Sequence, residues 1–192
     1  RCKEISNERT VDDVIVVSIG YGRDRSIDYT PTQVSEVTGG APQFLEFIRN
    51  QLIPEMQQRY SVDTTRNGRT ILGHSYGGLF GAWAFAVSNE LFGNYILLSP
   101  SLWYDNEIVN RLEKVHRGTN EEREQLVFMG IGEMENSGRM QAPFEAFYQI
   151  LLKNYQHIRL AKNQEKNLSH MGSKDPNIVL GLKFYFDNRY PK

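Results

Sequence analysis

Short apolar runs separated by longer amphipathic segments are the feature that most restricts how this chain folds. Apolar residues recur at three- and four-residue spacing between the runs, as in the stripe Phe44, Phe47, Ile48 and Leu52, which is typical of helices. Short buried strands that alternate with helices predict an α/β protein with a mostly parallel sheet and helices on both faces. The candidate strands are residues 14–19, 70–72, 95–99, 126–131 and 157–160.

This alternation also predicts where chemistry gathers. Right-handed crossovers place all the strand carboxyl ends along one edge of the sheet, and functional groups collect there. We expect a single domain over residues 1–192, because no repeat or linker interrupts the pattern. A long loop is expected at residues 20–40, and Pro54 is expected to kink or end the helix that begins near Pro42.

Charge and composition exclude several classes of partner. The 192 residues carry a formal net charge of −1, so no overall attraction to nucleic acid or acidic lipid is expected. No apolar stretch approaches the roughly 20 residues that span a bilayer. The single cysteine, Cys2, leaves no internal disulfide. Without a zinc-spaced Cys/His cluster or a phosphate-binding glycine loop, we expect no metal or organic cofactor.

The hexapeptide GHSYGG at residues 73–78 places Ser75 among glycines between a strand and an apolar helix. The pattern G-x-S-x-G at such a junction is the nucleophile elbow of α/β-hydrolases, a tight turn that lifts the serine hydroxyl above the sheet. We expect Gly73 and Gly77 to be small because side chains there would strike the neighbouring strand and helix. The N–H of Tyr76 is then one oxyanion-hole donor. The alternative is a glycine-rich turn that holds a serine by chance.

A serine nucleophile needs a base, and in this fold an acid and then a histidine follow the serine along the chain. His170 lies in the polar loop NLSHMGSKDP, between the last candidate strand and the last helix, where the base belongs. His157, at a helix–strand junction, is the alternative. We interpret His74 as local packing that points away from Ser75, and His116 as a solvent-facing residue.

The acid is expected in the segment GIGEMEN, directly after the strand at residues 126–131. Glu133 and Glu135 both qualify, and we favour Glu135, although a loop carboxylate is often only solvated. The second oxyanion-hole donor comes from the loop after an earlier strand in this fold. In the segment SIGYG, the N–H of Tyr21 is our choice.

Four segments together resemble the Putative esterase family of α/β-hydrolases, in the branch of the enterochelin and salmochelin (siderophore) esterases. In chain order they are VVSIGYGRDRSIDYTPT, RTILGHSYGGLFGAWA, LFGNYILLSPSLWYDN and LSHMGSKDPNIVLGLKFYF, and they cover most of the chain. The resemblance implies an α/β-hydrolase fold with Ser75 as nucleophile, His170 as base and Glu135 as acid. It implies a location in the bacterial periplasm or cytoplasm. Family members have further strands before residues 14–19, so it also implies that the N-terminal strands are reduced here.

The resemblance further implies that the substrate is a small-molecule ester of an iron-chelating catecholate. Arg23 and Arg25 are candidates for binding it, because guanidinium pairs with carboxylate oxygens in a forked geometry and stacks on aromatic rings. The alternative is that both arginines are solvated and paired with Asp24 and Asp28.

Aromatic residues near the expected catalytic edge are the remaining candidates. Trp103 and Tyr104 follow the strand that ends before Pro100, so they line the substrate pocket or pack in the core. Two other functions stay open: a carbohydrate-linked esterase that releases ferulate or acetate, and a non-catalytic hydrolase-like binding protein.

Overall fold

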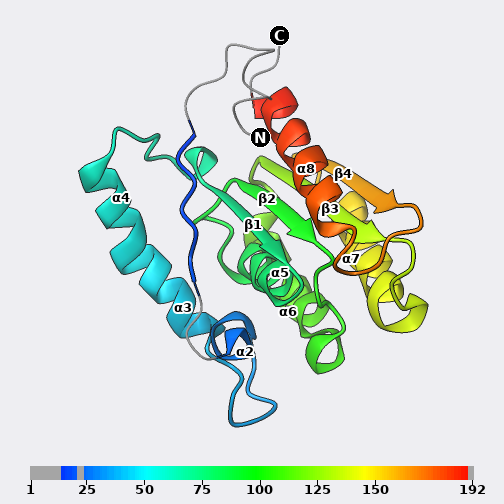
Figure 1. Ribbon diagram of the computed structural model, residues 1–192. Coiled ribbons are helices and arrows are strands. Elements are labelled where there is room, and N and C mark those ends of the chain that lie inside the picture. Colours follow the sequence, from blue (N-terminus) through cyan, green and yellow to red (C-terminus); the bar gives the residue numbers. More distant parts are fainter. Residues whose placement is uncertain (1–13, 21–23, 190–192) are drawn as a thin grey trace.

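A parallel β-sheet forms the centre of the computed structural model, which describes residues 14–20 and 24–189 (Figure 1). Across these residues the strand order is β1-β2-β3-β4, and each neighbouring pair runs parallel. The parallel sheet predicted from the alternating pattern is therefore confirmed. Its strands are β1 (Thr70–His74), β2 (Asn94–Leu98), β3 (Gln125–Gly132) and β4 (Ile158–Glu165).

The strand sequences account for the burial of the sheet. All residues of β2, with the sequence NYILL, are buried, as expected of a strand covered on both faces. β4 ends in the polar sequence KNQE and mixes exposed with partly buried residues, because it lies at an edge of the described sheet. His74 pairs with Leu98, which in turn pairs with Gly130. The carboxyl ends of the strands therefore share one edge.

Helices cover both faces of this sheet, as predicted (Figure 1). On one face α5 packs directly on β1 and β2, and together with α6 and α7 it encloses the larger core. On the other face α8 packs on β2 and β3 and encloses a smaller core around Ile96 and Phe128. The bounds are α5 (Tyr76–Ser88), α6 (Tyr104–Asn120), α7 (Ala142–Asn154) and α8 (Lys174–Arg189), with a π-helical turn η3 (Ser137–Gln141) before α7.

A helical arm lies beside β1, and it shows that the helix does not end at Pro54 (Figure 1). It consists of α3 (Ala41–Phe47), a π-helical turn η1 (Ile48–Leu52) and α4 (Ile53–Arg59), so the helix neither ends at Pro54 nor breaks there. At the end of η1 the N–H of Ile53 bonds to the carbonyl of Ile48, five residues back. Pro54 then occupies the first turn of α4, where the fixed φ of proline suits the helix.

The loop expected at residues 20–40 contains a short helix, α2 (Arg25–Tyr29). Asp24 caps this helix, because its Oδ1 accepts the N–H of Ser26 at 2.8 Å. The loop is then fastened to the start of α6, where Thr32 Oγ1 donates to Asp105 Oδ2 at 2.7 Å. A 3-10 turn, η2 (Arg66–Gly68), precedes β1.

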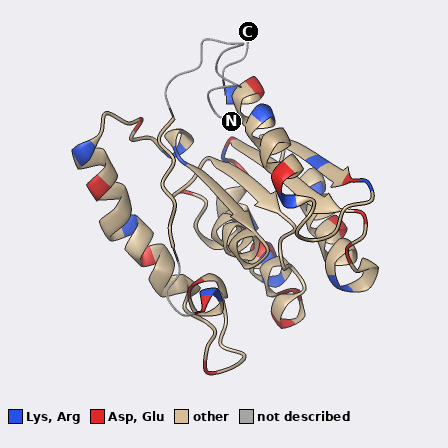
Figure 2. Cartoon of the chain, in the orientation of Figure 1, with Lys and Arg blue, Asp and Glu red and all other residues tan. Residues whose placement is uncertain are grey.

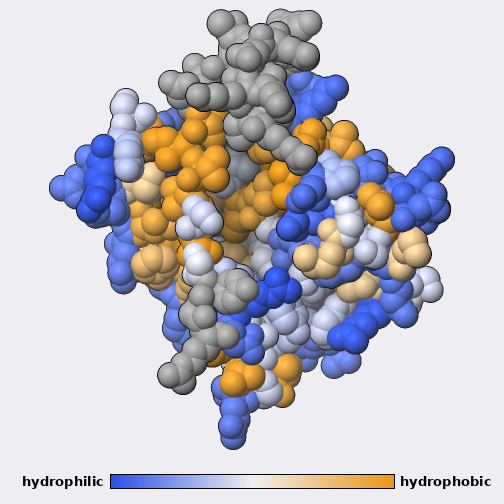
Figure 3. All heavy atoms as spheres, viewed as in Figure 1, coloured by the Kyte–Doolittle hydropathy of each residue, from blue (hydrophilic) through white to orange (hydrophobic). Residues whose placement is uncertain are grey.

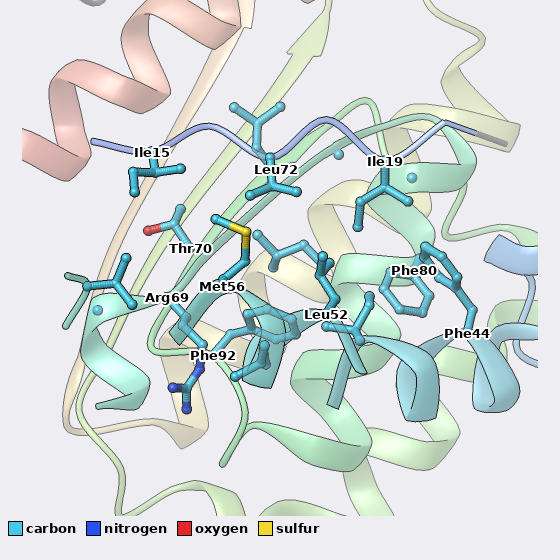
Figure 4. Close-up of a pocket in the computed structure, with 18 of the residues that line it drawn as sticks. Ile15, Ile19, Phe44, Leu52, Met56, Arg69, Thr70, Leu72, Phe80 and Phe92 are labelled. Carbon is cyan, nitrogen blue, oxygen red and sulfur yellow. The ribbon is translucent and has the colours of Figure 1, made fainter. Parts of the chain in front are cut away.

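The apolar segment 14–19 is not a buried strand, contrary to the prediction. It makes no strand pairing, and Val16, its most exposed hydrophobic residue, is 74% exposed. Alternate residues nevertheless face the same way: Figure 4 shows Ile15 and Ile19 turned toward a pocket beside β1. Alternate side chains of segment 14–19 therefore pack toward the pocket, but the backbone of this segment does not pair with β1.

This pocket is an apolar groove of about 460 Å³ between the arm and β1, which is an edge strand of the described sheet. Hydrophobic side chains gather around the hollow at the surface (Figure 3). Leu52 and Met56 line it from the arm, and Phe80 and Phe92 line it from the core side (Figure 4). His74 also lines the groove, so the groove reaches the carboxyl end of β1.

Charged residues are spread over the outer surfaces of the helices. Figure 2 shows acidic and basic residues interspersed along α3 and α4, with neither sign on β1 or β2. For residues 14–20 and 24–189, no helix has both the length and the apolar character needed to cross a bilayer.

Candidate active site

Ser75 lies on a sharp turn between β1 and α5. Its φ of 59° and ψ of −117° form a conformation that residues with a Cβ rarely adopt. The Ser75 N–H donates to the carbonyl of Leu98 at 2.9 Å, and the Ser75 carbonyl accepts the N–H groups of Leu79 and Ser101. The turn is thus held by β2, by α5 and by the segment after β2. This is the strand–turn–helix context that a nucleophile elbow requires.

Two glycines allow this elbow to close. A Cβ on Gly73 would lie 2.2 Å from the carbonyl oxygen of Gly77, and a Cβ on Gly78 would lie 3.0 Å from the carbonyl oxygen of Leu98. The steric prediction is wrong for Gly77, where a Cβ would meet nothing within 4 Å. α5 turns Gly78, rather than Gly77, toward the end of β2.

Glu135 and His170 meet at the same edge of the sheet. His170 Nδ1 lies 2.7 Å from Glu135 Oε2, and the Glu135 side chain is 1% exposed. The other oxygen, Oε1, accepts the Ser99 hydroxyl at 2.6 Å and the Gly132 N–H at 2.9 Å. Burial alone would raise the pKa of Glu135, but hydrogen bonds from His170, Ser99 and Gly132 outweigh it and hold that pKa below 4.5. The carboxylate is therefore ionised at neutral pH and can orient the imidazole.

The competing candidates lie elsewhere. Glu133 is exposed, and its Oε2 accepts the N–H of Asn167, so it fastens the loop that carries His170 rather than the imidazole itself. His157 is exposed, with Nε2 4.0 Å from a carboxylate oxygen of Glu122. His116 is partly buried on α6.

The hydroxyl of Ser75 is engaged by a cation. Arg25 Nη2 donates to Ser75 Oγ at 3.1 Å, and Ser101 Oγ lies 3.5 Å away. Among the described residues, Ser75 and His170 share no hydrogen bond. The loop of His170 reaches the residue before Ser75, because the ring of His74 packs 4.5 Å from the ring of His170, centroid to centroid.

The structure describes one of the two predicted oxyanion-hole donors. Tyr76 is the first residue of α5, and N–H groups in a first helical turn have no carbonyl four residues back to bind. Tyr21 lies outside the described residues, as does Arg23. The roles of all these residues stay predictions.

Aromatic side chains border a second hollow of about 580 Å³, which both Tyr76 and Trp103 line. Trp103 is half-buried, with its ring centroid 6.3 Å from that of Tyr76. The Arg139 guanidinium carbon lies 3.8 Å from the centroid of the Trp103 ring, within range of a cation–π contact. Tyr104 also lines the hollow but is only 3% exposed. Trp103 thus stands at the wall of the hollow, as a pocket residue would.

Sequence reasoning missed four contacts at this edge. Ser99 holds Glu135, Ser101 lies beside Ser75, His74 contacts the loop of His170, and Arg139 covers Trp103. A signal was present in the triplet SPS at residues 99–101, which places two hydroxyls directly after a buried strand. Searched over residues 14–20 and 24–189, the chain brings together no three His, Cys, Asp or Glu side chains that could hold a metal ion.

The fold and this edge together define a class. A parallel sheet with a serine on a tight strand–helix turn, and a histidine–carboxylate pair beside it, has the layout of an α/β-hydrolase. The family model Esterase, described as Putative esterase, matches residues 2–174, and the chain belongs to this family. The resemblance seen in the sequence is thereby confirmed.

Known proteins similar to this chain include siderophore esterases. The chain is 38% identical over 103 residues to the siderophore triacetylfusarinine C esterase of Aspergillus fumigatus, covering 48% of this chain and 35% of that protein. It is 30% identical over 141 residues to the ferri-bacillibactin esterase BesA of Bacillus subtilis, covering 63% of this chain and 48% of that protein. The structure of the BES protein from Bacillus cereus superposes with a TM-score of 0.76 at 28% identity, covering 84% of this chain and 63% of that one. The chain thus spans less than half the length of these two curated relatives.

Proposed function

We propose that this protein hydrolyses carboxylic esters of the siderophore type through an acyl-enzyme on Ser75. The observation that carries the proposal is the His170–Glu135 hydrogen bond, which lies at the same sheet edge as the Ser75 elbow. Membership of the esterase family supports ester hydrolysis. The names of the two curated relatives support an ester of an iron-chelating molecule as substrate.

The proposed reaction is two acyl transfers. His170 Nε2 takes the proton of Ser75 while Oγ forms a bond to the ester carbonyl carbon, and the N–H groups of Tyr76 and Tyr21 stabilise the oxyanion. The carbon–oxygen bond to the alcohol then breaks, and the alcohol leaves with the proton from His170. Water enters, gives a proton to His170, attacks the acyl carbon and releases the acid, and the proton returns to Ser75 Oγ. Glu135 stays ionised throughout and stabilises the charged imidazole.

The position of Arg25 supports the proposal that the substrate is anionic. Its guanidinium donates to Ser75 Oγ, which ties up a lone pair of the proposed nucleophile. A catecholate or carboxylate oxygen is a stronger acceptor than a neutral hydroxyl and matches the forked guanidinium. We therefore expect an anionic ester to draw Arg25 away from Ser75, so that binding of substrate frees the nucleophile.

The second hollow supports an aromatic group on that substrate. Trp103 offers a half-buried ring at the wall of the hollow, near the start of α5, and Arg139 and Arg25 place positive charge over Trp103 and Tyr76. A catechol ring carries both the π-face and the oxygens that such a surface binds. This favours a catecholate over an acetylated sugar.

A panel of esters tests the proposal. We expect kcat/KM for a cyclic catecholate trilactone to exceed that for methyl ferulate and for acetylated xylan by at least about tenfold, which corresponds to about 1.4 kcal/mol of transition-state stabilisation. Ser75→Ala should abolish all turnover, whereas Ser61→Ala, at an exposed serine before β1, should change nothing.

Two outcomes would contradict the proposal. Faster release of ferulate or acetate than of catecholate would favour a carbohydrate-linked esterase. Tight binding of the trilactone by folded wild-type protein without any hydrolysis would favour the non-catalytic binding protein.

A further inference from the structure

His74 contacts the loop of the proposed base, although the sequence indicates only local packing for it. It is the last residue of β1 and directly precedes Ser75. Its Nε2 lies 2.9 Å from the backbone carbonyl oxygen of His170, and the two imidazole rings lie at an interplanar angle of 42°. A carbonyl oxygen can only accept, so His74 Nε2 carries the proton and donates.

The surroundings of His74 keep its ring neutral. Burial lowers the pKa of His74 below 6.5, and the charges of His170 and Arg25 act in the same direction. The hydrogen bond to the His170 carbonyl and the charge of Glu135 oppose them without reversing the direction. A neutral donor holds the loop without adding a second positive charge beside the base when the base is protonated.

The path of the chain explains why such a contact is needed. The loop that carries His170 leaves β4, whereas Ser75 follows β1 at the opposite edge of the described sheet. The loop is tied to the end of β3, where the N–H of Met134 donates to the carbonyl of Leu168. Of the hydrogen bonds between described residues, the one from His74 alone joins β1 to this loop.

We propose that His74 is a positioning residue, which ties the backbone of His170 to the strand of Ser75 and so fixes the distance between base and nucleophile. Glu135 sets the orientation of the imidazole from β3, and His74 sets the position of its backbone from β1. This inference rests on the proposed function of the same site. A displacement of about 1 Å between reacting groups can cost roughly a hundredfold in rate.

Three variants of the full chain test the inference. His74→Leu fills a similar volume without a donor, and His74→Gln restores an N–H near the position of Nε2. His157→Gln is the matched control, because that histidine is exposed and lies away from the site. The readouts are kcat and KM for p-nitrophenyl acetate, the rate of labelling by a fluorophosphonate, and the midpoint of thermal unfolding.

We expect His74→Leu to lower kcat and the labelling rate about 10- to 100-fold with KM nearly unchanged, and His74→Gln to recover to within about threefold of wild type. His157→Gln should match the wild type. The inference is overturned if folded His74→Leu keeps at least a third of wild-type kcat, or if folded His74→Gln loses tenfold or more. Should His74→Leu not fold, the value for His74→Gln decides.

Ser75→Ala and His170→Ala separate this inference from the proposed function. If the wild type is not labelled, or if these two variants hydrolyse as well as the wild type, the proposed function has failed and the inference with it. If they are inactive while His74→Leu is fully active, only the role of His74 is wrong.

Discussion

The guanidinium of Arg25 donates a hydrogen bond to the hydroxyl of Ser75 across 3.1 Å. The cation comes from α2 and the proposed nucleophile from the β1–α5 turn, 50 residues apart in the sequence. One contact thus places a positive charge directly beside the oxygen of the proposed nucleophile.

Replacing Arg25 should therefore affect charged and neutral esters in opposite ways. Arg25→Met should raise KM for nitrophenyl hemisuccinate about tenfold, because a charge-assisted hydrogen bond is lost. The kcat/KM for nitrophenyl butyrate should not fall, since the hydroxyl of Ser75 is freed. Steady-state kinetics with both esters measure this, with Arg25→Lys as the charge-retaining control. An equal rise of KM for the two esters would show that Arg25 does not recognise charge.

The two candidate acids give the second prediction. Glu135→Gln should lower kcat about a thousandfold or more, because the amide cannot stabilise the imidazolium and favours the wrong tautomer of His170. Glu133→Gln should keep kcat within about threefold, since Glu133 bonds to the N–H of Asn167. Parallel kinetics of the two purified variants decide it. A slow Glu133→Gln beside a normal Glu135→Gln would reverse the assignment.

Ser99 gives a prediction that depends on pH. The pKa of Glu135 is lowered in the folded state, so its charge stabilises the fold above pH 4.5 and this contribution is lost as pH falls through the lower folded pKa. Ser99→Ala removes a hydrogen bond to that charge and should cost about 1.5–3 kcal/mol of unfolding free energy at pH 7. The cost should shrink once Glu135 is protonated.

Denaturant unfolding at pH 7 and at an acidic pH at which Glu135 is protonated measures the effect. Ser101→Ala is the control, because the Ser101 hydroxyl lies beside the Ser75 hydroxyl rather than a carboxylate. A loss for Ser99→Ala that is equal at the two pH values would mean that its bond to Glu135 does not depend on the charge.

A buried ion pair far from the site gives a prediction about stability. Glu113 is fully buried and accepts from Arg117 Nε and Nη2 at 2.8 Å each and from the hydroxyl of Tyr155 at 2.9 Å. Arg117→Met should destabilise the fold by about 3–5 kcal/mol, because it leaves a buried carboxylate without its cation. Arg111→Met, at an exposed arginine that pairs with Asp105, should cost no more than about 1 kcal/mol. Equal losses in chemical denaturation would contradict this account.

The sequence predicted those parts of the fold that depend on the spacing of apolar and polar residues within a short stretch of chain. The runs that became β2 and β3 are apolar and largely buried, so local pattern and burial agree there. The segment 14–19 has the same pattern, yet its residues find apolar partners in the groove without pairing with β1. Hydropathy alone does not distinguish a strand that pairs within a sheet from an extended segment that only packs its side chains against a groove.

Other differences between the prediction and the structure arise from hydrogen bonds that cannot be predicted from the pattern of residues. Pro54 fits within the arm because η1 shifts the bonding by one residue before it. For the candidate site, residue types and chain order singled out Ser75, His170 and Glu135, which the fold brings to one edge. The contacts of His74 and Ser99 were not foreseen, because both depend on how a distant loop crosses the ends of the strands.

Labelling by a fluorophosphonate tests the central claim most directly, since the probe reacts with a serine only when a base activates it. Mass spectrometry of the labelled wild-type chain should locate the adduct on Ser75, and Ser75→Ala and His170→Ala should each lose it while Ser61→Ala keeps it. Folded wild-type protein that stays unlabelled, or that carries the adduct on another serine, would contradict the account.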